Sequence, residues 1–177
     1  MSISSELRQQ VRQRASFACE FCGITESNSG GELTIDHYHP QSQGGSDEPE
    51  NLIYSCSRCN LYKADYWPQN AEQTVLWNPR TEPFAIHFIE SENGQLYPLT
   101  AIGSFSLLRL RLNRPQLIQS RQMKRQRHKD IELIQRYSEL VDTLNQLNLQ
   151  MSYLMNEQQE LLKEQRDLLK LLLKHQH

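Results

Sequence analysis

The sequence predicts an α+β fold in which a small metal-stapled domain of short strands and helices precedes one long helix. Two cysteine pairs of the form C-x-x-C, Cys19/Cys22 and Cys56/Cys59, predict the staple. Between and after these pairs, short β-prone runs alternate with turn-rich stretches and short helical patterns. From Gln116 onward the chain is rich in Leu and Gln and holds no Gly or Pro, which is typical of an uninterrupted helix.

Length and composition limit the classes of protein to which the chain can belong. With 177 residues it can form one domain plus an appendage. No apolar run approaches the roughly 20 residues needed to cross a bilayer, and the first residues lack the apolar stretch of a secretory signal. We therefore expect a soluble, cytoplasmic protein without membrane association, divided near Pro115 into residues 1–115 and 116–177.

The first element expected is a helix that begins after Ser4 or Ser5, either of which can cap it. Leu7, Val11 and Ala15 recur at helical spacing. The helix should end just before the first cysteine pair.

Two short strands and a helix are expected next. Residues 33–36 and 52–55 have strand patterns, and the turn-forming residues 43–49 lie between them. Ser57 can cap a following helix that carries Asn60. The expected order is therefore strand, loop, strand, helix.

A hairpin, a short helix and the long helix should complete the chain. Residues 84–89 alternate in character ahead of an Asn-Gly turn and residues 95–99 return, which is typical of a β-hairpin. Residues 104–112 have an amphipathic helical pattern that ends at residues 113–115. The long helix is expected from there on.

The cysteine spacing is the most specific local signal. Two thiolates on a tight C-x-x-C turn can face one ion, and two such turns supply the tetrahedron that zinc prefers. Disulfides are rare in cytosolic chains, and a redox C-x-x-C would not require a second pair. The pattern predicts a structural Zn²⁺ with no coordination position left for catalysis. Its ligands are Cys19, Cys22, Cys56 and Cys59.

The residues in and around the cysteine frame form a distinctive series. They are Cys19, Cys22, Ile35-Asp36-His37, Pro40, Ser42, Gly44-Gly45, Asp47, Asn51-Leu52, Cys56, Cys59-Asn60 and Lys63. In this series the chain resembles the HNH endonucleases of the ββα-metal type, in the subgroup that carries two C-x-x-C pairs. The resemblance is strongest over residues 15–63. It implies a one-metal nuclease acting on DNA, with His37 as the base, Asp36 and Asn60 on the metal, and Asn51 supporting the loop that aims the imidazole.

The roles of Asp36, His37 and Asn60, unlike that of Asn51, also follow from the chemistry of phosphodiester hydrolysis. This reaction needs an activated water and a cation that polarises the phosphoryl oxygens and assists the departing alkoxide. Asp36 and Asn60 offer oxygen ligands of the kind that Mg²⁺ or Mn²⁺ takes. At neutral pH the imidazole of His37 can accept a proton from the attacking water.

The roles of three further residues are open. His39 lies two residues after His37 and can contact phosphate, contribute to the metal, act as an alternative base or be a partly exposed polar residue. Lys63 lies one helical turn after Asn60 and can reach a phosphate. For His87 a structural or surface role is favoured. The remaining histidines, expected on the surface of the long helix, are His128, His175 and His177.

The net charge of -2 conceals a basic stretch. No acidic residue occurs between Glu92 and Asp130, where eight of the nineteen Lys and Arg residues lie. A charge run alone more often forms a solvated helix face, but beside a nuclease motif it is expected to contact a polyanion such as DNA. The candidate contacts in the long helix are Arg121, Lys124, Arg125 and Arg127.

Leucines at every seventh residue of the long helix predict self-association. A second apolar series follows four residues later and is interrupted by Gln158 and Gln165. A third series from Ile134 widens the apolar face beyond a strict two-stranded interface, so the helix can join a higher oligomer or fold back on its own domain. We expect a homo-oligomer formed through residues 131–173. The leucine series is Leu133, Leu140, Leu147, Leu154, Leu161 and Leu168.

One alternative to a nuclease is open, and a second is disfavoured. A non-catalytic, zinc-stabilised module would bind nucleic acid and oligomerise through the helix, but it has no need to retain Asp36, His37 and Asn60 together. A basic stretch ahead of leucine heptads is also typical of bZIP transcription factors. Pro115 and the missing bZIP core sequence weigh against that class. The favoured prediction is an HNH endonuclease that hydrolyses phosphodiester bonds in DNA.

Overall fold

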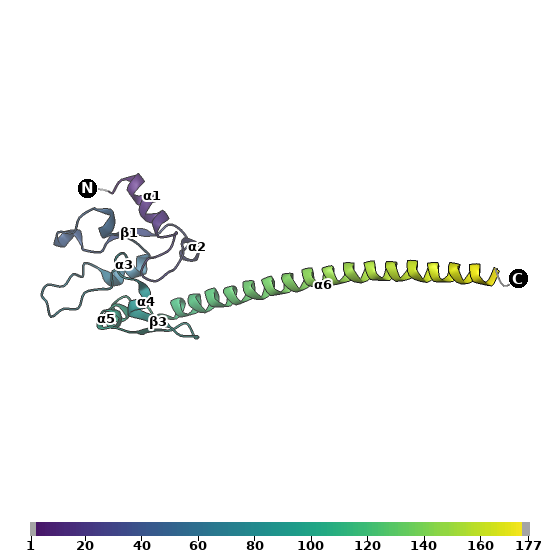
Figure 1. Ribbon diagram of the computed structural model, residues 1–177. Helices are drawn as coiled ribbons and strands as arrows, with labels where there is room; N and C mark the ends of the chain where they lie inside the picture. The colour runs from purple at the N-terminus through teal and green to yellow at the C-terminus, as the bar shows by residue number, and fades with distance from the viewer. Residues whose placement is uncertain (1–2, 175–177) are drawn as a thin grey trace. The chain divides into compact units, whose positions relative to one another are not determined.

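The computed structural model describes residues 3–174, which form two compact units that meet between Arg125 and Gln126. Figure 1 shows short helices and strands in the first unit, while the second consists of helix alone. The predicted α+β class with a long last helix is therefore confirmed. The ends of the two predicted domains, together with His175 and His177, lie outside the described residues.

The elements follow one another in an order close to the expected one. They are α1 (Ser5–Arg14), α2 (Glu26–Ser29), β1 (Thr34–His37), η1 (Gln41–Gln43), η2 (Pro49–Asn51), β2 (Leu52–Ser55), α3 (Ser57–Lys63), α4 (Phe84–His87), β3 (Phe88–Glu90), β4 (Leu96–Pro98), α5 (Ala101–Arg109) and α6 (Pro115–Lys174).

The start of α6 belongs to the first unit. Leu117 is only 1% exposed, and Arg121 donates from Nη1 to the backbone oxygen of Gly94 at 2.6 Å. The change in composition at Pro115 marks where the helix begins, but contacts with the first unit continue to Arg125.

Side-chain caps fix where α1 and α3 begin. Ser4 Oγ accepts a hydrogen bond from the Leu7 amide at 3.1 Å, as one of the two expected caps of α1. Helix α3 is capped by Cys56 and not by the expected Ser57, because the Cys56 sulfur accepts from the Cys59 amide at 3.5 Å. A cysteine at a helix N-terminus is favoured as a thiolate by the helix dipole.

Strands β1 and β2 form an antiparallel pair with Asp36 opposite Ile53 and His37 opposite Leu52. All four residues of β2 are buried, and α1 packs against this strand. Residues of β1 are more accessible, and α3 packs against β1. The ββα order places Asp36 and His37 on the open strand of the pair, beside α3.

The expected strand over residues 84–89 is wrong for its first four residues, which form the helical turn α4. The helical spacing brings the rings of Phe84 and Phe88 within 4.9 Å of each other, and both contact Trp77 at 5.6 and 5.3 Å. Pro83 precedes the turn with a φ of -58°, which suits a helix start. The sequence of residues 84–89 is compatible both with a strand of alternating residues and with a helical turn that pairs Phe84 with Phe88. Packing of these two rings on Trp77 favours the helical turn.

Helix α5 begins earlier than the expected residue 104. Thr100 caps it, since its Oγ1 accepts a hydrogen bond from the Gly103 amide at 3.0 Å. The same oxygen lies 2.7 Å from His87 Nδ1, so the cap also ties α5 to α4.

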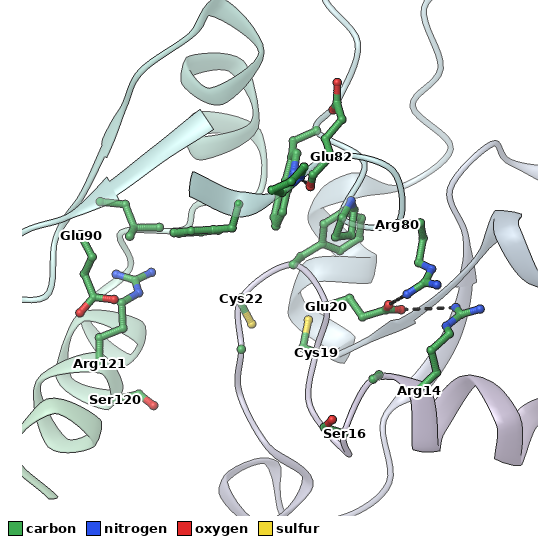
Figure 2. A pocket seen from close by; sticks show the side chains of 18 of the residues that line it. Arg14, Ser16, Cys19, Glu20, Cys22, Arg80, Glu82, Glu90, Ser120 and Arg121 are labelled. Atoms are coloured by element: carbon green, nitrogen blue, oxygen red, sulfur yellow. Dashed lines mark hydrogen bonds and ion pairs between the residues drawn. The ribbon is translucent and has the colours of Figure 1, made fainter. Parts of the chain in front are cut away.

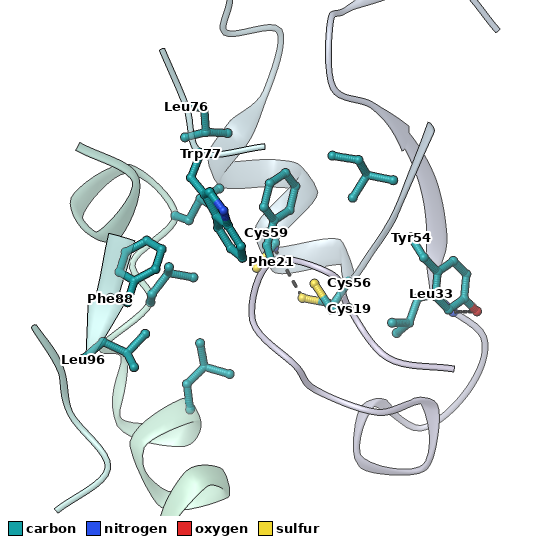
Figure 3. Close-up of a cluster of buried hydrophobic side chains, with 14 of the residues drawn as sticks. Cys19, Phe21, Leu33, Tyr54, Cys56, Cys59, Leu76, Trp77, Phe88 and Leu96 are labelled. Atoms are coloured by element: carbon teal, nitrogen blue, oxygen red, sulfur yellow. Dashed lines mark hydrogen bonds between the residues drawn. The ribbon is translucent and has the colours of Figure 1, made fainter. Parts of the chain in front are cut away.

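The core of the first unit joins the cysteine pairs to the hairpin that follows them. Figure 3 shows Phe21, between the first two cysteines, facing Trp77, with ring centroids 6.4 Å apart. Phe88 and Leu96 from the two hairpin strands are 2% and 3% exposed in the same cluster. The hairpin is therefore integral to the first unit.

The second unit is the remainder of α6. All side chains described from Gln126 to Leu172 are exposed, including every leucine of the heptad series. Within residues 3–174, no helix combines the length and the apolar character that crossing a membrane requires.

Candidate metal centre and active site

The four cysteines form a cluster suited to one metal ion. Their Sγ atoms all lie within 4.8 Å of one another, and those of Cys22 and Cys56 are 3.7 Å apart. A zinc–sulfur bond of about 2.3 Å implies a tetrahedron edge of about 3.8 Å, so the spacing fits a tetrahedral zinc site. One pair lies on the turn after α1, and the other lies at the first turn of α3.

Electrostatics of the cluster also favour a bound cation. Contact with Cys22 raises the pKa of Cys19, and contact with Cys19 raises that of Cys59. Thiolates so close to one another repel, and a cation between them allows all four to ionise. The cluster also contacts a cation that the sequence did not predict. Arg114 Nη2 lies 3.7 Å from the sulfurs of Cys22 and Cys59.

Asn51 fixes the loop between β1 and β2. Its Oδ1 accepts from the His39 amide at 2.8 Å, and its Nδ2 donates to the backbone oxygens of His39 at 3.0 Å and Ser46 at 2.8 Å. Gly45 lies in the same loop, where a Cβ would fall 1.8 Å from the His39 oxygen, so only glycine fits. Asn51 therefore holds the chain immediately after His37 in one conformation.

His37 faces a carboxylate. Its Nε2 lies 2.7 Å from Asp47 Oδ1, and its side chain is 16% exposed. The hydrogen bond from His37 lowers the pKa of Asp47, so this carboxyl is ionised at neutral pH. Asp47 was not among the predicted site residues, although it is one of the positions that carry the family resemblance. Nothing in its spacing indicated that the loop would bring it back onto His37.

Asp36 is held by a buried lysine. Lys63 is 1% exposed, and its Nζ lies 3.3 Å from Asp36 Oδ1. Burial raises the pKa of Asp36 and lowers that of Lys63. The other oxygen, Oδ2, is buried and has no hydrogen-bond partner within residues 3–174. A buried carboxylate oxygen without a partner is costly, and a divalent cation would satisfy it.

Asn60 lies on α3 beside β1. Its Nδ2 donates to Thr34 Oγ1 at 3.5 Å, while Lys63, one turn later, pairs with Asp36. The packing of α3 on β1 thus places Asn60 and Lys63 beside the strand that carries Asp36 and His37. The structure directs the Lys63 ammonium inward to Asp36, and the expected phosphate contact of Lys63 stays a prediction.

His39 packs beside the site on an aromatic surface. Its ring stacks on Trp67 with centroids 3.9 Å apart and planes at 22°, and Tyr38 meets Trp67 edge-on at 5.8 Å. The Nε2 atom of His39 is buried and unpaired within the described chain. Trp67 was not expected at the site, because no periodic pattern connects it to the strands.

His87 has a structural place away from the site. It is 4% exposed, and its Nε2 lies 3.4 Å from Glu82 Oε2 while its Nδ1 faces Thr100.

The four predicted nucleic-acid contacts on α6 differ in their surroundings. Arg121 donates to the backbone oxygens of Gly94 and Leu112, and Arg125 pairs with Glu90 at 3.2 Å. These two guanidinium groups hold the β3–β4 hairpin. The side chains at the other two positions, Lys124 and Arg127, are exposed. Contact with nucleic acid stays a prediction for all four.

A cavity of about 670 Å³ lies next to the first cysteine pair (Figure 2). Its charged lining is largely self-paired, since Glu20 contacts Arg80 at 2.8 Å and Arg14 at 3.7 Å. None of the expected catalytic residues lines it. The cavity is thus separate from the Asp36–His37 site.

Comparison with known families identifies the central segment. Residues 19–65 match the model of the family described as HNH endonuclease. This range includes all four cysteines together with Asp36, His37 and Asn60, so the predicted resemblance of this segment to HNH endonucleases is confirmed. HNH domains generally belong to nucleases, which act on nucleic acids. No curated protein and no solved structure matches the chain.

Proposed function

We propose that the protein is a metal-dependent endonuclease that hydrolyses phosphodiester bonds in DNA. The observation that carries this proposal is the grouping of Asp36, His37 and Asn60 on one ββα unit, with an unpaired, buried Asp36 oxygen. A base beside two oxygen ligands is the minimum set for metal-assisted hydrolysis.

His37 takes the proton of the attacking water in this proposal. An ionised Asp47 accepts a hydrogen bond from Nε2–H, which keeps the proton on that nitrogen and leaves the lone pair on Nδ1. Asn51 supports the loop that follows His37 and carries Asp47. The imidazole is thereby held in the tautomer that a general base requires.

Asp36 and Asn60 are the proposed ligands of a divalent cation, Mg²⁺ or Mn²⁺. When bound, this ion supplies Lewis-acid stabilisation of the phosphoryl oxygens and of the departing alkoxide. The unpaired Oδ2 of Asp36 supports this assignment, because a neighbouring cation relieves the cost of its burial. Lys63 holds the other oxygen of the same carboxylate and so fixes its direction.

The cysteine cluster is the proposed site of a structural Zn²⁺ on Cys19, Cys22, Cys56 and Cys59. Four thiolates complete the tetrahedron, so this ion holds the frame and takes no part in hydrolysis. Binding would contribute on the order of 10 kcal/mol to folding, and a strong chelator is expected to unfold the domain. Four free thiols also suit a reducing compartment, which supports a cytoplasmic location.

Self-association through residues 131–173 is part of the proposal. The heptad leucines are exposed in a single chain, for example 53% for Leu133 and 61% for Leu168. Association of several copies would bury this face.

Plasmid and single-stranded DNA incubated with Mg²⁺ or Mn²⁺ test the activity. His37→Ala should lower the cleavage rate by about 10²-fold or more, because it removes the base. His128→Ala, which alters an exposed histidine of α6, is the matched control and should cleave like the parent. Cleavage that His37→Ala leaves unchanged would refute the mechanism. DNA binding without cleavage under either metal would instead support the non-catalytic module.

A further inference from the structure

The exposed part of α6 carries four columns of residues that matter for pairing. In heptad positions a to g, the leucine series occupies d. The a column is Tyr137, Leu144, Met151, Gln158, Gln165 and Leu172. The e column is Ile134, Val141, Asn148, Met155, Leu162 and Leu169. The g column is Arg136, Thr143, Gln150, Glu157, Glu164 and Leu171.

The e and g columns decide the orientation of a partner helix, because they flank the a and d seam. In a parallel pair each g residue faces an e residue of the other copy. Glu157 would then lie against Leu162 of the second copy, and Glu164 against Leu169. Carboxylates partly removed from water without a partner are costly, so the parallel arrangement is unfavourable.

In an antiparallel pair e residues face e residues, and one register matches the whole e column. It sets Ile134 against Leu162 and Val141 against Met155 of the second copy. Asn148, the single polar member, then meets its own copy on the two-fold axis. A shift by one heptad sets Asn148 against Met155 or against Val141, so other registers bury an unmatched amide.

The same register matches the g column and the seam. Arg136 faces Glu164 of the second copy, and Gln150 meets its own copy. Across the seam, Leu154 faces Leu144 and Leu161 faces Tyr137. Of the two glutamines of the a column, Gln165 falls near the end of the paired segment, where water is closer, and Gln158 faces Leu140 about midway between the axis and that end.

Building on the self-association proposed above, we propose that residues 130–168 of α6 pair antiparallel with the same residues of a second copy, about a two-fold axis level with residue 149, between Asn148 and Gln150. Two features favour a second copy as the partner and favour this register. Arg136 faces Glu164 in the g column, and Asn148 faces Asn148 of the other copy in the e column. With about 1.5 Å of rise per residue, the two Gln126 positions lie about 70 Å apart along the pair. The two HNH domains are therefore attached at opposite ends of the helix pair.

Crosslinking of the full-length, zinc-loaded protein tests the orientation. With a short bismaleimide, Asn148→Cys should give a covalent dimer, whereas Leu133→Cys should not, because the two copies of residue 133 lie about 48 Å apart in this register. The parent, whose own cysteines are in the metal cluster, is the background control. A crosslinked Leu133→Cys with unreactive Asn148→Cys would establish parallel pairing and overturn the proposal. A monomer by sedimentation at micromolar concentration would overturn it as well.

A charge exchange tests the register. Arg136→Glu should weaken self-association by about tenfold, since it places two carboxylates together at both ends of the symmetric pair. Adding Glu164→Arg to this variant should restore the parent value. Lys163→Glu, at the outer f position, is the matched control and should leave the dissociation constant unchanged. Failure of the double variant to recover would refute this register. These measurements need no cleavage, so they are independent of the proposed nuclease activity.

Discussion

Arg114 donates from Nη2 to the sulfur of Cys59 at 3.7 Å, immediately before α6 begins. The same nitrogen lies 3.7 Å from the Cys22 sulfur and 3.8 Å from that of Cys56. One zinc ion with four thiolates carries a net charge of about -2, and a charge buried in this way requires a compensating cation. The Arg114 carbonyl also accepts from the Leu117 amide at 2.9 Å, which connects the metal cluster to the first turn of α6.

Replacing Arg114 should loosen the metal. Arg114→Gln removes the cation that faces three sulfurs, and loss of such an outer contact typically costs about 10- to 100-fold in metal affinity. We expect zinc to pass to a chromogenic chelator faster by a similar factor. Arg111→Gln is the matched control. Arg111 and Arg114 both lie over the Tyr62 ring, and the Arg111 guanidinium is 4.7 Å from the ring centroid. Equal release rates in the two variants would contradict the role of Arg114.

The contact of Arg114 with the cysteines also marks the limit of sequence reasoning. The C-x-x-C pairs predicted a metal cluster because two thiols within one turn need only local geometry. Arg114 lies 55 residues from Cys59, and its approach depends on how the helices after the hairpin pack on the domain. The spacing of residues in the sequence therefore does not predict that Arg114 contacts the cysteine sulfurs.

The site shows the same division between local and tertiary information. Asp36 and His37 were predicted because they are adjacent in a recognisable motif, and Asn51 because it occupies a matching position of the same family pattern. Lys63 was expected to reach a phosphate near the metal, since sequence position gives only its helical turn and not the direction of its side chain. The packing of α3 on β1 turns it inward to Asp36, at 3.3 Å.

Loss of the Asp47 carboxylate should slow the chemical step and leave substrate binding unchanged. An amide at this position can donate to His37 Nε2 and would move the imidazole proton to Nδ1, where the base needs its lone pair. We expect kcat of Asp47→Asn to fall by about 100-fold with little change in KM. Steady-state cleavage kinetics measure this, with Asp65→Asn as an exposed aspartate control. A change confined to KM would assign Asp47 to substrate binding.

As the pH is lowered, the affinity for the catalytic cation should begin to fall at a higher pH than it would with an aspartate ligand of ordinary pKa. Burial raises the pKa of Asp36, and the protonated carboxyl cannot act as a ligand. Affinity is therefore fully present above the raised pKa and falls about tenfold for each pH unit below it. Mn²⁺ titrations followed by electron paramagnetic resonance at a series of pH values should show this decline. Asp36→Asn should bind weakly at every pH, and an unchanged parent affinity down to the usual pKa of aspartate would contradict the expectation.

The residue after α3 should be improved by glycine. Ala64 has φ 49° and ψ -150°, a conformation that strains any side chain, and its backbone oxygen accepts from Lys63 Nζ at 3.3 Å. Ala64→Gly removes the strain but adds freedom to the unfolded chain, for a net gain of about 1 kcal/mol in the free energy of unfolding. Urea unfolding at saturating zinc measures it. Ala71→Gly, in an exposed turn without positive φ, should be neutral or slightly destabilising. If both glycines destabilise the protein equally, the Lys63–Ala64 contact holds the turn without strain.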